Sequence, residues 1–113
     1  MAFKLVVSNK VLTKVKGFYK DETGVSRAFN FELEQDRIDQ DQLKQIVSDK
    51  HEDASDFLKR VTKGWRHQRL VLTEDDKPAE FGADAFDVLL SVAGMGGYCF
   101  QAYLAQVLVN EKN

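Results

Sequence analysis

At 113 residues the chain has room for one domain with a single hydrophobic core. Hydrophobic residues make up 43% of it and the net charge is −2, which excludes an intrinsically disordered chain and a protein that binds nucleic acid through bulk positive charge. The single cysteine, Cys99, excludes an internal disulfide and a cysteine-based metal site, so we expect it to be a small buried residue.

Hydropathy along the chain gives no membrane or export signal. No apolar run approaches the roughly 20 residues that span a bilayer, and the first seven residues are too short and too polar for a signal peptide. We therefore expect a soluble, cytoplasmic protein with no membrane partner.

The first third of the chain has the patterns of antiparallel strands. We expect these strands at about 3–7, 11–20 and 26–34. In the third, strict alternation places Phe29, Phe31 and Leu33 on one face, which some other element must cover. A polar segment ending at Gly24 joins the second and third strands and has the composition of a hairpin turn.

Beyond Asp36 the apolar period changes from that of a strand to that of a helix. We expect four helices, at about 40–50, 53–63, 84–93 and 97–109. Asp39 and Gln42 resemble a capping box at the start of the first. Trp65 lies in phase with the apolar stripe of the second, which we expect to end near Gly64.

The two helix pairs are separated by a β-like stretch, and the last two helices by glycines. Residues 70–72 form a short β-like run, and 73–78 have the composition of a turn that contains Pro78, the only proline. Asp84 is the expected cap of the third helix, and the glycine-rich segment 94–97 is the expected joint before the fourth. The predicted fold class is α+β: an N-terminal antiparallel hairpin or meander followed by about four helices.

A search for chemistry finds no convincing constellation, so we expect no enzyme, no cofactor and no metal. His51 and His67 lie among polar and charged neighbours, and Cys99 has no nearby cation in sequence to lower the pKa of its thiol. The acidic residues 74–76 lack the ligand count and turn glycine of a calcium loop. The glycines of 94–97 follow a helical stripe and not a strand, so they do not form a phosphate-binding loop.

Charge is divided into blocks of alternating sign. Residues 1–31 carry +4, 32–56 carry −6, 57–69 carry +5 and 70–113 carry −5. Such blocks can face each other within the fold or across an interface with a protein partner. The basic block, with Trp65 among its cations, would also suit a single-stranded nucleic acid, although we expect a protein partner.

A set of short motifs in the second half of the chain has a familiar order and spacing. It comprises Phe57-Leu58, Val61, Gly64-Trp65, Glu74-Asp75-Asp76, Pro78, Phe81, Ala85-Phe86, Leu89-Leu90 and Ala102-Tyr103-Leu104. In this set the chain resembles the tail assembly chaperones of long-tailed bacteriophages and prophages. The resemblance covers about half the chain. It departs from the family pattern at Asp76-Lys77-Pro78, where a glycine is usual after the aspartate, and at the glycines of 94–97.

The resemblance implies a non-enzymatic chaperone of virion morphogenesis. Such a protein binds the tape-measure protein, keeps its long helical chain soluble, helps to recruit tail-tube subunits and leaves before the virion matures. Two alternatives remain open at this point: a minor structural tail or head–tail protein that stays in the virion, and a small regulator that binds nucleic acid through residues 59–69. Self-association is a further possibility that the sequence does not decide.

We assign two groups of residues on this basis. Partner binding is expected to involve Arg66, Arg69, Phe86, Leu90, Met95, Phe100 and Leu104. A structural role is expected for Trp65, Pro78, Phe81 and Tyr103. Of the structural group, Trp65 and Tyr103 should be largely buried, each with its polar tip hydrogen-bonded.

Overall fold

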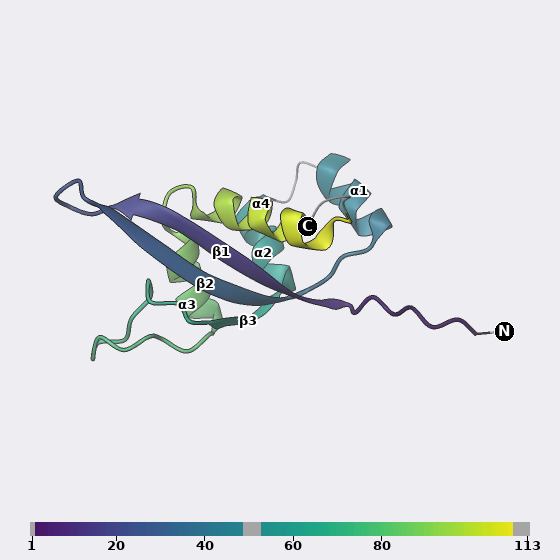
Figure 1. Cartoon of the computed structure of the whole chain (residues 1–113), viewed down its shortest axis with the longest axis horizontal. Helices are drawn as coiled ribbons and strands as arrows, with labels where there is room; N and C mark the ends of the chain where they lie inside the picture. The colour runs from purple at the N-terminus through teal and green to yellow at the C-terminus, as the bar shows by residue number, and fades with distance from the viewer. Residues whose placement is uncertain (1, 49–52, 110–113) are drawn as a thin grey trace.

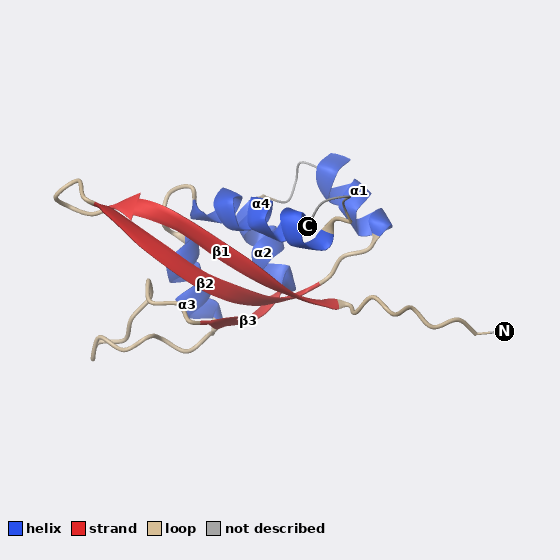
Figure 2. Cartoon of the chain, viewed as in Figure 1, coloured by secondary structure: helices blue, strands red, loops and turns tan. Residues whose placement is uncertain are grey.

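The computed structural model describes residues 2–48 and 53–109. Its elements are, in order, β1 (Lys10–Lys20), β2 (Ser26–Asp36), α1 (Gln40–Ser48), α2 (Ala54–Val61), β3 (Thr62–Arg66), α3 (Ala83–Leu90) and α4 (Met95–Val107) (Figure 1). The three strands form one antiparallel sheet in the order β1-β2-β3. Figure 2 shows the helices gathered against this sheet, which confirms the predicted α+β class.

The β1–β2 hairpin is the longest feature of the molecule and was correctly predicted. Its strands pair without interruption from Lys10 opposite Asp36 to Lys20 opposite Ser26. The turn between them uses Gly24 at φ +83°, a conformation that favours glycine. Phe31 and Leu33 are buried on the face that α4 and the other helices cover, as their alternation indicated.

The predicted helix over 53–63 is wrong at its C-terminal end. Helix α2 stops at Val61, and the next five residues form strand β3, which places Trp65 opposite Leu33 and Gly64 opposite Glu34. The free edge of β2 supplies hydrogen-bond partners that outweigh the weak helical propensity of this threonine, glycine and tryptophan segment. A Cβ on Gly64 would overlap the Glu34 carboxylate, so the missing side chain gives this carboxylate its space.

The strand predicted at 3–7 is also wrong. These residues are extended but pair with no strand, and Phe3 and Val6 are 92% and 91% exposed. The composition favours a strand, but a strand exists only where a second strand lies beside it, and the described sheet ends at β1. We call residues 2–8 the N-terminal arm; Figure 1 shows it running away from the body of the molecule.

The start of α1 is the capping box that the sequence predicted. The Gln42 backbone N–H donates to Asp39 Oδ1 at 2.9 Å, and the Asp39 N–H donates to Gln42 Oε1 at the same distance. The predicted end of this helix, residues 49–50, lies outside the described residues.

Helices α3 and α4 begin and end at other residues than predicted. Gly82, not Asp84, is the N-cap of α3, and α3 ends at Leu90, three residues before the predicted limit. Gly94 at φ +82° then turns the chain into α4, which begins at Met95, so the predicted joint is largely the first turn of this helix. The two helix axes differ in direction by 104°.

Two clusters of buried side chains form the core. The larger joins the sheet to the helices through Val15, Phe31, Leu33, Leu58, Val71, Phe86, Leu89, Met95 and Cys99. The smaller holds α2 against α4 through Phe57, Val61, Tyr103 and Val107. Burial of this kind contributes roughly 1.5–3 kcal/mol for each large aliphatic or aromatic side chain, which makes it the main stabilising term.

Of the four residues expected to be structural, Trp65, Phe81 and Tyr103 lie in or against these clusters, whereas Pro78 is exposed. Tyr103 is fully buried, and its hydroxyl donates to the Asp36 carbonyl oxygen at 2.7 Å. Trp65 is half-buried rather than largely buried; its ring packs edge-on to Phe81 and its Nε1–H donates to the Ala79 oxygen at 3.1 Å. Pro78 forms an isolated antiparallel bridge with Leu72, which closes the predicted turn.

Candidate functional site: an apolar groove beside the hairpin

Cys99 and His67 are the described residues whose side chains the sequence offered for nucleophilic or acid–base chemistry. Cys99 is completely buried, as expected, and burial raises the pKa of its thiol to about 12, so it carries no nucleophilic thiolate near neutral pH. His67 is exposed, and His51 lies outside the described residues. No group of three or more His, Cys, Asp or Glu side chains in residues 2–48 and 53–109 is placed to hold a metal ion.

None of the helices in the described part of the chain is long and apolar enough to cross a bilayer alone. Only α3 and α4 taken together reach the length and composition, and they are sharply bent relative to each other.

Most of the cations in residues 59–69 form ion pairs with carboxylates of the same molecule. Arg66 Nε lies 2.7 Å from Glu34 Oε2 on the outer face of the sheet, the face opposite the helices. Lys63 Nζ lies 3.8 Å from Asp36, and Lys59 Nζ lies 2.8 Å from Asp87 on α3. The hydrogen bond to Asp87 raises the pKa of Lys59.

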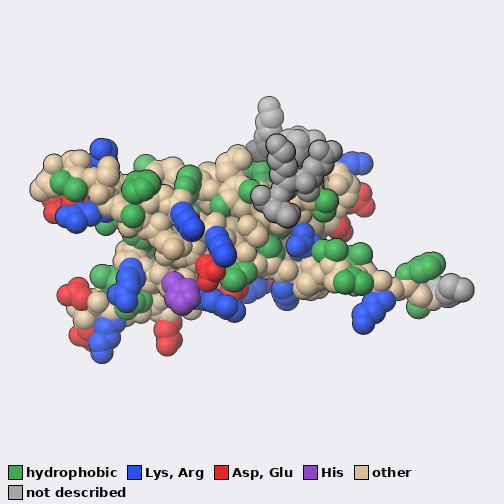
Figure 3. Space-filling view, in the orientation of Figure 1, with side chains coloured by type: hydrophobic (Ala, Val, Ile, Leu, Met, Phe, Trp, Pro, Cys, Tyr) green, Lys and Arg blue, Asp and Glu red, His purple; other side chains and the backbone are tan. Residues whose placement is uncertain are grey.

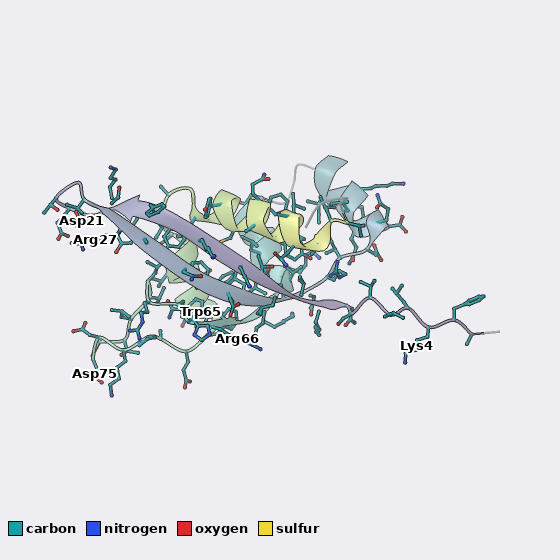
Figure 4. All side chains as sticks on the ribbon, in the orientation of Figure 1. Lys4, Asp21, Arg27, Trp65, Arg66 and Asp75 are labelled. Carbon is teal, nitrogen blue, oxygen red and sulfur yellow. The ribbon has the colours of Figure 1, made fainter. Side chains whose placement is uncertain are left out.

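These ion pairs decide between the two arrangements that the charge blocks allowed. The acidic residues of β2 lie between the lysines of β1 and the cations of β3, with Lys10 Nζ 2.5 Å from Asp36 Oδ1. The blocks therefore face each other within the fold. Figure 4 shows Arg66 beside Trp65 at the sheet, where Glu34 partly offsets its charge.

An apolar groove between the end of the hairpin and the start of α4 is the clearest candidate for a binding site. It has a volume of about 380 Å³ and is lined by Gly17, Phe18, Tyr19, Phe29, Val92, Ala93, Gly94, Met95 and Tyr98. No charged side chain is in its lining. Figure 3 shows the hairpin end projecting from the body as a separate lobe that carries hydrophobic side chains.

The floor of the groove depends on Gly17. A Cβ at this position would lie 2.7 Å from the Phe29 ring and 3.1 Å from the Tyr98 ring, so only glycine lets both rings lie against β1. Phe29 and Tyr98 pack edge-to-face at 6.1 Å between centroids, and the Tyr98 hydroxyl donates to the Lys16 carbonyl oxygen. These contacts fix α4 to the hairpin and hold the groove open between them.

The opposite wall is formed by the turn between α3 and α4. Gly94, in its left-handed conformation, sets the direction of this turn, and Val92 beside it is 48% exposed. Met95 closes the inner end of the groove and belongs to the core. Gly96 faces away from the groove: a Cβ there would lie 2.5 Å from the Ser55 Oγ atom, so it serves the close packing of α4 on α2.

The residues predicted to bind a partner are spread over the molecule. Met95 alone among them lines the groove. Phe86 is buried in the core, and Leu90, Phe100 and Leu104 are half-buried and packed against it, so these four are mainly structural. Arg66 belongs to the ion pair with Glu34, and Arg69 is exposed beyond the end of β3.

Sequence reasoning missed the exposed residues that shape the groove. Phe18 and Tyr19 are 76% and 43% exposed, and Tyr98 and Val92 are about half exposed. The signal was present in Phe18-Tyr19, because two adjacent aromatic residues in a strand point to opposite faces and one of them must leave the core. Val92 and Tyr98 gave no comparable signal, since each fits an apolar helical stripe.

Comparison of the chain with protein-family models, with curated proteins and with solved structures finds no significant match.

Proposed function

We propose that this protein is a tail assembly chaperone of a long-tailed bacteriophage or prophage, which binds the tape-measure protein through the apolar groove. The motifs that carry the resemblance include Trp65, Phe81, Phe86 and Tyr103, which pack in or against the two core clusters. They therefore support a shared fold, and they say little about the binding surface. The groove supplies that surface.

The observation that carries the proposal is the uncharged groove with exposed apolar walls. A soluble protein seldom leaves a concave apolar surface open unless something binds there. At about 380 Å³ the groove takes a few anchoring side chains and not a whole helix. It therefore suits a partner that presents apolar residues at intervals of three or four along an amphipathic helix.

Such a partner matches the chemistry of a tape-measure chain. A long apolar helical protein associates with itself before the tail tube encloses it, so its apolar stripe has to be masked for a time. The groove masks one short segment, and several copies of the chaperone mask a long chain. Tail-tube subunits that compete for the same stripe then displace the chaperone without any nucleotide.

Two valines on neighbouring turns give a matched test. Val92 lines the groove, whereas Val88 on α3 is 56% exposed and lies outside the groove lining. In co-expression with fragments of the tape-measure protein, Val92→Ser should weaken binding about tenfold, because it removes the burial of one aliphatic side chain. Val88→Ser should change binding less than about twofold.

Two outcomes of this experiment would contradict the proposal. If both valine variants retain full binding, or if both lose it to the same extent, the groove is not the tape-measure site. Mass spectrometry of purified virions adds a separate check, since a stoichiometric amount of the protein in mature particles contradicts a chaperone that leaves the tail.

A further inference from the structure

The N-terminal arm is an apolar segment that pairs with no strand of the described sheet. Phe3, Leu5 and Val7 alternate with Lys4 and Val6, so the three apolar residues share one face of the extended chain. Phe3 and Leu5 are 92% and 80% exposed. An exposed apolar segment of this length can add as a strand to the edge of a sheet, and Phe3, Leu5 and Val7 would then lie on one face of it.

The base of the arm is held, so the arm leaves the body at a fixed place. The Arg37 backbone N–H donates to the Asn9 oxygen at 2.7 Å, and Arg37 Nε donates to the Ser8 oxygen at 3.0 Å. Arg37 Nη1 also donates to the Val107 oxygen at 2.9 Å, which ties this point to the end of α4. Figure 4 places Lys4 on the arm at the end of the molecule opposite Asp21 and Arg27, which mark the hairpin tip.

At the hairpin end, the outer edge of β1 has backbone groups that face away from β2 and could pair with an added strand. β1 is the outermost strand, and the Lys16 carbonyl points away from β2 because Tyr98 is its hydrogen-bond donor. In an uninterrupted antiparallel ladder alternate residues point the same way, so the backbone groups of Phe18 and Lys20 face this outer edge too. The apolar groove lies directly beside this stretch of edge.

From these placements we infer that the N-terminal arm of one copy docks on the hairpin end of a second copy. Residues 3–7 add as a strand to the edge of β1 at Phe18–Lys20, and Phe3, Leu5 and Val7 enter the apolar groove. The contact joins two different surfaces, so it links copies head to tail or exchanges arms within a closed dimer. This self-association does not depend on the identity of the client.

A second copy is required because the arm is too short to reach its own groove. From Lys10, seven residues of fully extended chain reach about 24 Å at most, whereas Phe18 lies about 26 Å along β1. Even a complete reversal of the arm at Ser8 would bring only its first residues near the groove. Docking within one molecule therefore leaves Leu5 and Val7 outside it.

The two faces of the arm supply the test. In sedimentation velocity of the full chain over a range of concentrations, Leu5→Ser should raise the dissociation constant of self-association about tenfold. Val6→Ser removes a similar apolar group from the opposite face and should change it less than about twofold. Tyr19→Ser, on the same face of β1 as Gly17 at the groove floor, should weaken association as Leu5→Ser does.

Disulfide trapping locates the contact directly. Mixing the Leu5→Cys and Val92→Cys variants should give a covalent heterodimer faster than either variant forms a homodimer, while a mixture of Val6→Cys and Val92→Cys should cross-link more slowly. Cys99 is buried and does not compete. A protein that is monomeric at all concentrations, equal effects of Leu5→Ser and Val6→Ser, or preferential Leu5–Leu5 cross-linking would overturn the inference.

Discussion

Tyr103 links the smaller core cluster to the end of the sheet through a single buried hydroxyl. Tyr103→Phe keeps the ring but leaves the Asp36 carbonyl oxygen without this donor. We expect the free energy of unfolding in urea to fall by about 1–2 kcal/mol. Tyr19→Phe is the matched control because Tyr19 is 43% exposed, and it should change this free energy by less than about 0.5 kcal/mol. Equal losses in the two variants would show that the buried hydrogen bond contributes nothing specific.

At the scale of single residues, the sequence predicted well which side chains are buried and poorly which ones are exposed. Tyr103 and Cys99 lie in phase with an apolar stripe, and both are fully buried. Phe86 lies in phase as well, but we assigned it to a partner surface, and the structure buries it in the core. Periodicity identifies the face of a helix that packs inward, and it does not separate the middle of that face from its margins, where Val92 and Tyr98 remain exposed.

Asp21 organises the turn of the long hairpin. Its Oδ1 accepts hydrogen bonds from the Thr23 hydroxyl and from the backbone N–H groups of Thr23 and Val25, and its Oδ2 lies 2.9 Å from Arg27 Nε. The Thr23 hydroxyl first, and then Arg27, lower the pKa of the Asp21 carboxyl to about 2. The ionised form is thus the one that holds the turn.

The pH dependence of the hairpin follows from this pKa. Because the folded value lies below the ordinary value of about 3.9, the stabilisation is complete above about pH 4 and is lost as the pH falls towards 2. NMR chemical shifts of residues 19–27 should keep their strand character down to about pH 4 and lose it below. Asp21→Asn should weaken the hairpin at neutral pH and remove this acid transition. An unchanged transition in that variant would assign it to another carboxyl.

At the scale of elements, local sequence patterns predicted which helices and strands are present better than the residues at which they begin and end. The hairpin and the capping box at Asp39 depend on neighbouring residues, and both are present. Strand β3 depends on β2, some thirty residues earlier in the chain, which no window around Trp65 contains. The strand predicted at 3–7 was wrong because its strand pattern has no partner strand within the described fold.

For the whole molecule, the division of charge has a structural meaning. The first three charge blocks meet in the sheet, and their ion pairs lie on its outer face. Surface pairs of this kind add little stability, roughly 0–1 kcal/mol each, but they leave this face polar and nearly neutral. Exposed apolar side chains are concentrated instead on the arm and around the groove, with single ones such as Leu72 and Val88 elsewhere.

If the arm and the tape-measure chain bind as we propose, they compete for one groove. The arm of another copy would then cover the groove when no tape-measure chain is present, and each tape-measure segment that enters a groove would release one arm. The affinity for the tape-measure chain should therefore be higher in Leu5→Ser than in the unaltered chain, which is the reverse of what a client-binding arm would give.

Hydrogen exchange tests the central claim, that the groove binds the client, most directly. Amide exchange of the Leu5→Ser protein, whose groove the arm covers least, is measured alone and with tape-measure fragments. Our account predicts new protection in two separate segments at once, residues 17–20 on β1 and residues 92–98 around the start of α4, with little change at Thr62–Arg66. Protection confined to the outer-face strand β3, with unchanged exchange at 17–20 and 92–98, would contradict it.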